Sequence, residues 1–222
     1  MTTPLPALSL LETRVLGVLV EKQHTVADTY PLTLNALIAG CNQKTSREPV
    51  LSATDAEVQS TVDRLKSLSL IVESSGGRVM RYAHNVERVL GLPSQAVALL
   101  ATLMLRGPQT LGELRINCDR LHRFADISAV DAFLQELAAP PSGALVAELP
   151  RSPGSRENRW MHLLSGARPP ETVLGDGSAL PHGDVITMTE IAALKANVRH
   201  LEQELEALKR TVADLRSELG ST

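Results

Sequence analysis

The sequence contains few aromatic residues: two phenylalanines, one tryptophan and two tyrosines in 222 residues. Because 43% of the chain is nonetheless hydrophobic, we expect a core built mainly from leucine, valine and alanine. Strands are usually enriched in aromatic and β-branched residues, so this composition favours helices over large sheets. The chain is long enough for one large domain, or for two small domains with a tail.

Long apolar runs and an export signal are also missing. No stretch of about 18 apolar residues is present, so the sequence predicts no membrane-spanning helix and no membrane partner. Residues 1–10 lack a basic segment followed by an apolar run, which argues against a secretory signal. The two cysteines, Cys41 and Cys118, lie far apart and are expected to be reduced thiols. We therefore expect a cytoplasmic protein.

The motifs that commonly carry catalysis are absent as well. The sequence has no glycine-rich phosphate-binding motif, no HExxH and no paired CxxC. Cys118 and His122 are four residues apart and would form only half of a metal site, while Cys41 lacks a convincing base. His162, beside Trp160, is expected to be a packed structural histidine. We predict that the protein is not an enzyme and binds no metal and no cofactor.

An excess of positive charge is lacking, since the formal net charge is -3. The acidity is concentrated at the end of the chain, where residues 169–222 hold five Lys or Arg and nine Asp or Glu. Residues 1–90 hold nine of each, and residues 91–168 hold eight basic and seven acidic residues. A neutral body permits a local basic patch for nucleic acid but does not require one.

The chain ends in an unbroken heptad pattern over residues 191–219. Its apolar residues recur at steps of three and four, which keeps them on one stripe of a helix. The residues that we predict to dimerise are Ile191, Leu194, Val198, Leu201, Leu205, Leu208, Val212 and Leu215. Leucine at d with mostly β-branched residues at a favours a parallel two-stranded coiled coil. Glu190 and Glu204 at g would face lysines of a partner helix, which favours a homodimer.

An amphipathic helix that folds back onto its own domain is the alternative to this coiled coil. The stretch before it, residues 167–186, is rich in proline and glycine and has little apolar periodicity. Such a composition predicts a flexible linker. We assign residues 187–219 to the predicted coiled-coil helix and residues 1–166 to the body.

The body follows one plan twice, each time as three helices and a β-hairpin. The first copy covers residues 1–90 and the second covers residues 91–166. Apolar positions of the third helix match between the copies at a constant offset: Val58, Val62 and Leu65 against Val130, Leu134 and Leu137. We expect Pro31 in the first turn of the second helix, and Thr54 or Ser52 as the cap of the third. Thr110 and Glu113 predict a capping box.

Three helices and a hairpin are the arrangement of a winged helix-turn-helix. The predicted fold class is therefore mainly α with small β-hairpins (α+β). In detail, the sequence predicts tandem winged helix-turn-helix domains followed by a C-terminal coiled-coil helix.

Several polar strings in the body are specific enough to indicate a family. They lie at residues 12–17, 30–35, 41–50, 105–110, 112–115 and 156–159. These strings resemble the YceH family of uncharacterised bacterial proteins, and the resemblance covers most of residues 8–166. It implies tandem winged helices and often a C-terminal coiled coil, and it implies no known activity. The chain departs from the family at residues 116–118, where Arg, Ser or Ala is more usual.

In a winged helix, the third helix normally enters the major groove of DNA while the wing contacts the backbone or the minor groove. The predicted nucleic-acid contacts are the wing residues Arg151, Arg156, Arg159, Arg78 and Arg81, and the third-helix residues Gln59, Arg64 and Lys66. A solvated wing with internal ion pairs is the alternative. The third helix of the second copy exposes Asp131, Gln135 and Glu136, and an acidic helix repels phosphate.

The loop at residues 41–49 is long for a helix-turn-helix turn and almost wholly polar. Its residues of unassigned role are Asn42, Gln43, Lys44 and Arg47. They can satisfy helix ends and buried backbone groups, which we favour, or they can bind a partner or a nucleotide. We expect Arg47 and Glu48 to pair with a charge of the first helix, such as Glu12 or Arg14.

Two functional hypotheses follow from the sequence. The first is a DNA-binding protein, possibly a transcriptional regulator, whose dimer engages one duplex with two bodies. The alternative is a non-catalytic protein-interaction scaffold built from tandem winged helices, which acidic third helices suit better. The predicted partners are DNA, a second copy of the chain and a protein.

Overall fold

The structure is a computed structural model that describes residues 5–75, 79–139, 144–151 and 157–166. All of these residues lie in one compact unit, Met1–Glu171. The predicted linker and coiled-coil helix lie outside the described residues, as do Arg78 and Arg156, two of the predicted nucleic-acid contacts.

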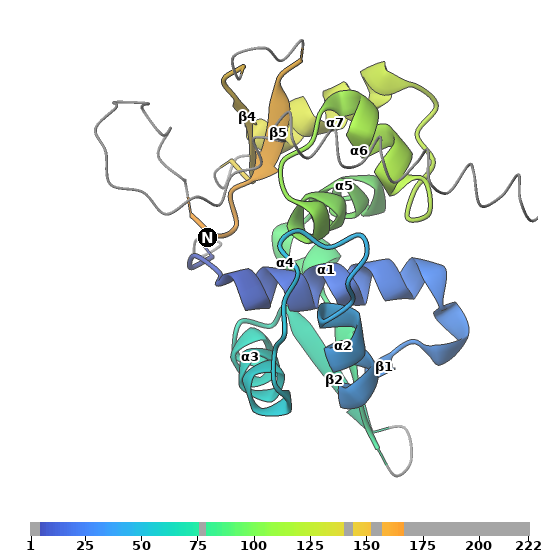
Figure 1. The fold of residues 1–222 in the computed structure, drawn as a ribbon, viewed down its shortest axis with the longest axis vertical. Helices are drawn as coiled ribbons and strands as arrows, with labels where there is room; N and C mark the ends of the chain where they lie inside the picture. The colour runs from blue at the N-terminus through green and yellow to red at the C-terminus, as the bar shows by residue number, and fades with distance from the viewer. Residues whose placement is uncertain (1–4, 76–78, 140–143, 152–156, 167–222) are drawn as a thin grey trace, which may run out of the picture. The chain divides into compact units, whose positions relative to one another are not determined.

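The described part of the chain is mixed α+β, with seven α-helices and two small antiparallel sheets (Figure 1). We call residues 1–90 the first repeat and residues 91–166 the second repeat. The first repeat contains α1 (Leu10–Thr25), the 3-10 helix η1 (Ala27–Thr29), β1 (Leu32–Thr33), α2 (Leu34–Cys41), α3 (Asp55–Ser67), β2 (Ile71–Ser75), β3 (Met80–His84) and α4 (Val86–Leu90). The second repeat contains α5 (Ser94–Arg106), α6 (Leu111–Cys118), α7 (Ile127–Ala138), β4 (Val146–Leu149) and β5 (Arg159–His162).

Side-chain caps mark where five of the described helices begin, and two of them were considered in the sequence. Thr54 caps α3, and its hydroxyl accepts a hydrogen bond from the backbone N–H of Glu57, whose side chain bonds back to the cap. The same capping box joins Thr110 and Glu113 at the start of α6. Each box satisfies backbone donors that have no partner within the helix. The box at α6 was predicted, and Thr54 rather than Ser52 caps α3.

The start of α2 differs from the sequence prediction, which placed Pro31 in its first turn. Pro31 instead precedes β1, and Thr33 caps α2 by accepting a hydrogen bond from the backbone N–H of Ala36 at 3.3 Å. The reason is long-range, because Leu32 pairs with Tyr82 of β3 and this pairing keeps the chain extended there. The Pro31 prediction was therefore wrong.

The two hairpins expected from the sequence are present as β2–β3 and β4–β5. In both repeats, the chain just before the second helix pairs with the second hairpin strand. In the first repeat β1 lies antiparallel to β3. In the second repeat an isolated bridge joins Gln109 to Trp160 of β5 through backbone hydrogen bonds of 3.0 and 2.7 Å. The repeats therefore share strand pairing as well as element order.

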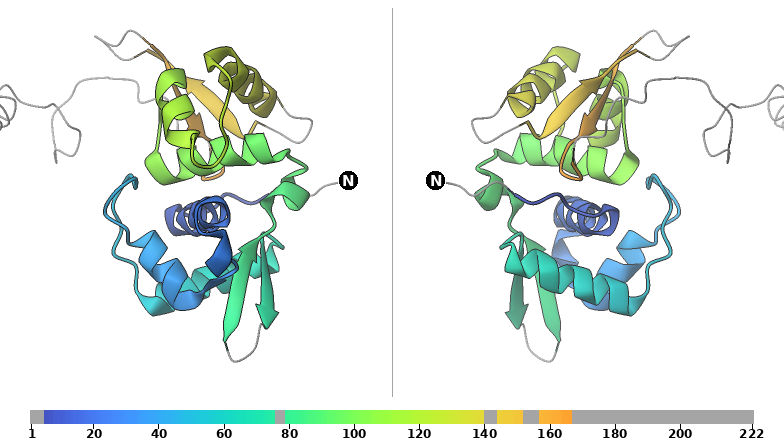
Figure 2. Two further views of the ribbon diagram at one scale, coloured as in Figure 1. Left: turned by 90° about the vertical axis from the view of Figure 1, so that its right-hand side faces the viewer. Right: turned by 90° about the vertical axis from the view of Figure 1, so that its left-hand side faces the viewer.

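The centre of the body is formed by α1 and α5, which pack against each other along the join between the repeats (Figure 2). Most of each helix is buried. A Cβ on Gly17 of α1 would lie 2.9 Å from Cγ of Leu105, so the absence of a side chain there permits the close approach. The backbone N–H of Leu8 also donates to the carbonyl of Leu164 at 2.8 Å. The two repeats thus share one apolar core.

Candidate functional site

The loop between α2 and α3 is anchored on α1 by a buried ion pair. The guanidinium of Arg47 donates to both carboxylate oxygens of Glu21, at 3.1 and 2.6 Å. The side chain of Arg47 is 0% exposed and that of Glu21 is 15% exposed. Burial alone raises the pKa of Glu21, but hydrogen bonds and charge from Arg47, with a smaller effect of Lys22, hold that pKa below its usual value.

The ionic contacts of α1 differ from those expected. Glu12 pairs with Arg64 of α3 rather than with Arg47. Arg14 is fully buried and donates to the backbone carbonyls of Cys41, at 3.3 Å, and Pro49, at 2.6 Å. The predicted pairing of Arg47 with a charge of the first helix is therefore present, but the partner is Glu21 and not Glu12. Sequence reasoning missed Arg14 as the residue that holds both ends of this loop.

The loop residues Asn42 and Gln43 also bond within the protein. The amide of Asn42 donates to the carbonyl of Ala53 at 2.8 Å and accepts from its N–H at 2.7 Å. Gln43 accepts from Lys22 at 3.5 Å and donates to the carbonyl of Thr45 at 3.1 Å. These contacts favour the structural interpretation of the loop.

The same loop also contacts the second repeat. The backbone N–H of Glu48 donates to the carbonyl of Leu105 at 2.8 Å, and Arg106 donates to the hydroxyl of Ser46 at 2.7 Å. Lys44 is exposed and no hydrogen bond or ion pair holds it to the described residues. The α2–α3 loop therefore contacts both α1 and α5. Of the four loop residues of unassigned role, Lys44 is the one that is exposed and held by no such contact, so it is the one suited to a role at the surface.

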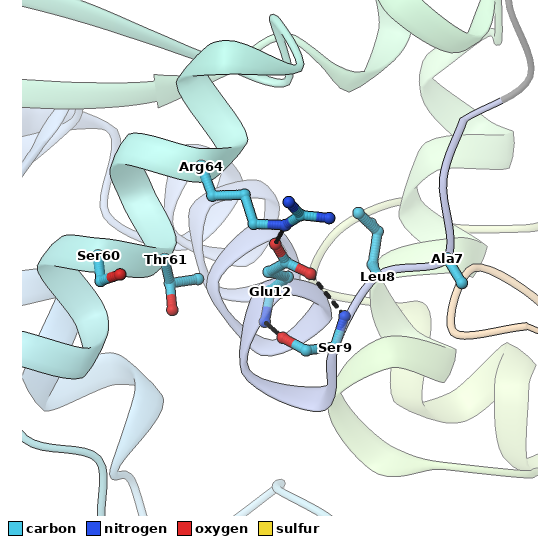
Figure 3. A pocket seen from close by; sticks show the side chains of 7 residues that line it. All are labelled: Ala7, Leu8, Ser9, Glu12, Ser60, Thr61 and Arg64. Carbon is cyan, nitrogen blue, oxygen red and sulfur yellow. Dashed lines mark hydrogen bonds and ion pairs between the residues drawn. The ribbon is translucent and has the colours of Figure 1, made fainter.

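Arg64, one of the three α3 residues predicted to contact DNA, forms an ion pair with Glu12 of α1. Its Nε lies 2.6 Å from Oε1 of Glu12, although the N–H does not point along the line of a hydrogen bond (Figure 3). The other oxygen of Glu12 accepts from the backbone N–H of Ser9, so the carboxylate serves both the cap of α1 and the contact with α3. An open depression of about 410 Å³ surrounds this pair.

Gln59 and Lys66, the other two α3 residues predicted to contact DNA, also bind side chains of the protein. Lys66 forms ion pairs with Glu73 of β2 and, at 3.8 Å, with Asp63. Gln59 donates to Asp63 at 3.2 Å. The cations of α3 therefore have carboxylate partners within the first repeat.

The described wing arginines fall into two groups. Arg81 donates to the carbonyls of Thr29, at 3.2 Å, and Pro31, at 2.8 Å. Arg159 donates to the carbonyl of Pro108 at 2.8 Å, and its guanidinium forms an ion pair with Glu113 at 3.1 Å. Arg151 is exposed and forms no hydrogen bond or ion pair with other described residues. The structure thus leaves one of the three described wing arginines available for an outside anion.

The exposed face of α7 carries no basic residue. Gln135 and Glu136 are exposed, Asp131 is half-buried, and Asp126 caps the start of the helix. Ile127, the first residue of α7, is 48% exposed. Ile127 lines a groove of about 260 Å³ that also contains Leu111 and Gly112 of α6, Glu148, Arg151, Glu157, Asn158 and Trp160. This groove lies between α7 and the second hairpin.

Both cysteines that the sequence offered as a nucleophile or a metal ligand are buried. Burial raises the pKa of Cys41 to about 12 and also raises that of Cys118. Burial lowers the pKa of His162 to about 4, which agrees with the predicted packed histidine. Within the described ranges, no three His, Cys, Asp or Glu side chains gather in a way that could hold a metal ion.

A polar cleft of about 150 Å³ lies between the repeats, bounded by the end of α1, the α2–α3 loop, α5 and α6. Its basic side chains are Lys22, Arg106 and Arg120, and its acidic side chain is Glu21. The sequence did not single out this cleft, because Lys22 belongs to the first repeat and Arg106 and Arg120 belong to the second.

In the part of the chain that the structure describes, no helix is both long enough and apolar enough to cross a bilayer. Comparison with known proteins found close relatives over nearly the whole length. The chain is 61% identical to a UPF0502 protein of Dechloromonas aromatica over 92% of this chain and 93% of the relative. It is 57% identical to a UPF0502 protein of Methylibium petroleiphilum over 97% and 91%.

A protein-family model described as "Protein of unknown function, DUF480" matches residues 8–155, which include most of both repeats. The name YceH, suggested by the sequence motifs, is not among these descriptions and stays a prediction. The expectation of an uncharacterised bacterial family is confirmed. The chain belongs to the DUF480 family of bacterial proteins, whose relatives are described as UPF0502 proteins.

Proposed function

We propose that this chain is a non-catalytic protein-binding module made of two winged-helix domains. Two features support the winged-helix assignment. Each repeat has three helices and a hairpin in the same order, and the segment before the second helix pairs with the second hairpin strand. In this assignment α3 and α7 are the third helices, and β2–β3 and β4–β5 are the wings.

The acidic character of α7 is the main observation that favours a protein partner over DNA. A third helix in the major groove lies among phosphates, where Asp131 and Glu136 are repelled and no cation of α7 compensates. In the first repeat, the cations of α3 already have carboxylate partners. The surface that a winged helix would place on DNA is therefore poorly suited to it, and DNA becomes the second hypothesis.

The groove between α7 and the second wing indicates the chemistry of the partner. Ile127 and Leu111 supply apolar side chains, and among the described lining residues the acidic ones are Glu148 and Glu157 and the basic one is Arg151. The adjoining face of α7 adds Glu136. A peptide segment with an apolar side chain between lysines or arginines complements this surface, since the apolar group fills the groove and the cations meet carboxylates.

A duplex titration distinguishes the two classes of partner. We expect the full chain to show no binding to a labelled generic duplex at low salt. If the wild type binds and the substitution of Arg151, Arg156 and Arg159 by Ala abolishes binding, with affinity falling steeply as salt rises, DNA is the partner and the proposal is wrong.

Panning a displayed random-peptide library on the full chain tests the groove directly. We expect enriched peptides to carry an apolar residue flanked by lysine or arginine, and Ile127→Glu to abolish their binding. Ile116→Glu is the matched control, because Ile116 is 73% exposed on α6 and does not line the groove. Peptides that bind equally well to both variants would place the binding surface elsewhere.

From the sequence alone, we propose that residues 187–219 join two copies of the module in the cytoplasm through a parallel coiled coil. We expect Leu201→Pro, or truncation after Gly183, to give monomers in sedimentation analysis, because proline interrupts a helix interior. Dimers that persist after truncation would show that the body, rather than the heptad segment, holds the pair together.

A further inference from the structure

The cleft between the repeats contains an arginine that forms no ion pair with any residue that the structure describes. Arg106, at the end of α5, donates to the hydroxyl of Ser46 at 2.7 Å, and no carboxylate of the described residues lies within ion-pairing distance of it. Burial lowers the pKa of Arg106, and Arg47 lowers it further while Glu21 raises it. A guanidinium remains charged at such sites, so an outside anion would supply the missing partner.

Glu21, the one carboxylate among the described residues that line the cleft, is already neutralised. Both oxygens of Glu21 accept hydrogen bonds from Arg47, and Lys22 adds an ion pair at 3.2 Å. The basic side chains of the cleft, together with Arg47 behind it, therefore exceed this single negative charge. At the rim, Arg120 is exposed, while the neighbouring Asp119 pairs with Arg123 at 3.5 Å. The charge left over in the cleft is positive.

The other lining residues are uncharged. Some are polar, among them Gln43, Ser46 and Asn117, and the apolar ones are Val26, Leu105 and Leu121. Asn117 donates its N–H to Gln109 at 2.7 Å, which fixes the orientation of its amide. The volume of about 150 Å³ is below the range of about 300–1,000 Å³ that is typical of drug-sized ligands. The occupant is therefore small.

We propose that this cleft binds a small phosphate anion, either free or carried by a small organic molecule, whose phosphate group lies between Arg106 and Arg120. The phosphate would receive charge-assisted hydrogen bonds from the two guanidinium groups. Because the cleft is lined from both repeats, with the α2–α3 loop and α1 on one side and α5 and α6 on the other, the ligand would bridge them. This proposal does not depend on the nature of the macromolecular partner.

Calorimetric titration of the full chain tests the site, with inorganic phosphate and glycerol 3-phosphate as probes at matched ionic strength. We expect saturable binding with one site per chain. Arg106→Gln and Arg120→Gln should each weaken it by at least about tenfold, a change of about 1.4 kcal/mol. Arg123→Gln is the matched control, since its side chain is 86% exposed and does not line the cleft.

Tighter binding of glycerol 3-phosphate than of inorganic phosphate would support an organic phosphate as the ligand, and equal binding would support the free ion. Arg120 lies at the exposed rim, so its substitution tests the site even where Arg106→Gln lowers stability. The absence of saturable binding in the wild type would overturn the proposal. An equal loss in Arg120→Gln and Arg123→Gln would also overturn it, because general electrostatic attraction would then explain the binding.

Discussion

Replacing Glu21 with alanine is expected to lower the free energy of unfolding by about 3–5 kcal/mol, the usual cost of removing one partner from a buried ion pair. The substitution leaves the guanidinium of Arg47, which is 0% exposed, without its carboxylate. Arg47 would keep hydrogen bonds to the carbonyls of Gly40 and Ser46, at 3.1 and 2.9 Å, but these groups carry no full negative charge. Urea unfolding of the full chain measures the change.

Two further variants show whether the loss comes from the buried pair. Lys22→Ala removes only a partly exposed ion pair with Glu21 and should cost less than about 1 kcal/mol. In the double variant Glu21→Ala/Arg47→Met, no unpaired charge is buried, so the loss should be smaller than the sum of the two single losses. A Glu21→Ala protein within 1 kcal/mol of the wild type would show that the loop is not held by this pair.

The pH dependence of stability follows from the same contact. The pKa of Glu21 in the folded protein lies below its ordinary value of 4.5, because Arg47 and Lys22 outweigh the effect of burial. A carboxyl group with a lowered folded pKa contributes stability above its unfolded pKa and loses it as the pH falls through the folded pKa. The stability difference between the wild type and Glu21→Gln should therefore be largest near neutral pH and should shrink below about pH 4.

Local sequence patterns were sufficient for six of the seven described helices and for two caps. The capping box of Thr110 and Glu113 depends on residues three apart, so the sequence alone shows both partners. The start of α2 depends instead on pairing between β1 and β3, about fifty residues along the chain. A proline next to a leucine-rich stretch fits a first helical turn equally well. The short helix α4 was not expected either, since five residues give too little periodicity to detect.

The binding surfaces were harder to predict, because the fold decides whether a charged side chain is already paired with a side chain from another element. The sequence correctly placed Arg64 on the third helix of the first repeat, but its partner Glu12 comes from α1. Arg159 was correctly placed on a hairpin, while Glu113 reaches it from α6. Counting cations therefore overestimated the basic surface, and the cleft at Arg106 escaped notice because its walls come from both repeats.

Replacing Gly40 with alanine is expected to lower the free energy of unfolding by about 2 kcal/mol, within the usual cost of overfilling a packed core. Gly40 lies in α2 where it contacts α1, and a Cβ there would lie 2.5 Å from Cγ1 of Val18. Carbon atoms normally approach to about 3.5–4.0 Å, so α1 and α2 would have to separate. Val18 is fully buried and β-branched, and its stiff χ1 angle limits escape by rotation.

A double variant and a second glycine separate this clash from the general effect of alanine on helices. Alanine is favoured over glycine in a helix by up to about 1 kcal/mol, so Gly112→Ala in α6, whose Cβ would meet only the hydroxyl of Thr110 at 4.0 Å, should be neutral or stabilising. Val18→Ala removes the atom that obstructs Gly40. Adding Gly40→Ala to Val18→Ala should therefore cost nothing or stabilise the protein, reversing the sign of its effect in the wild type. If Gly40→Ala destabilises both backgrounds equally, contact with Val18 is not what excludes a side chain at this position.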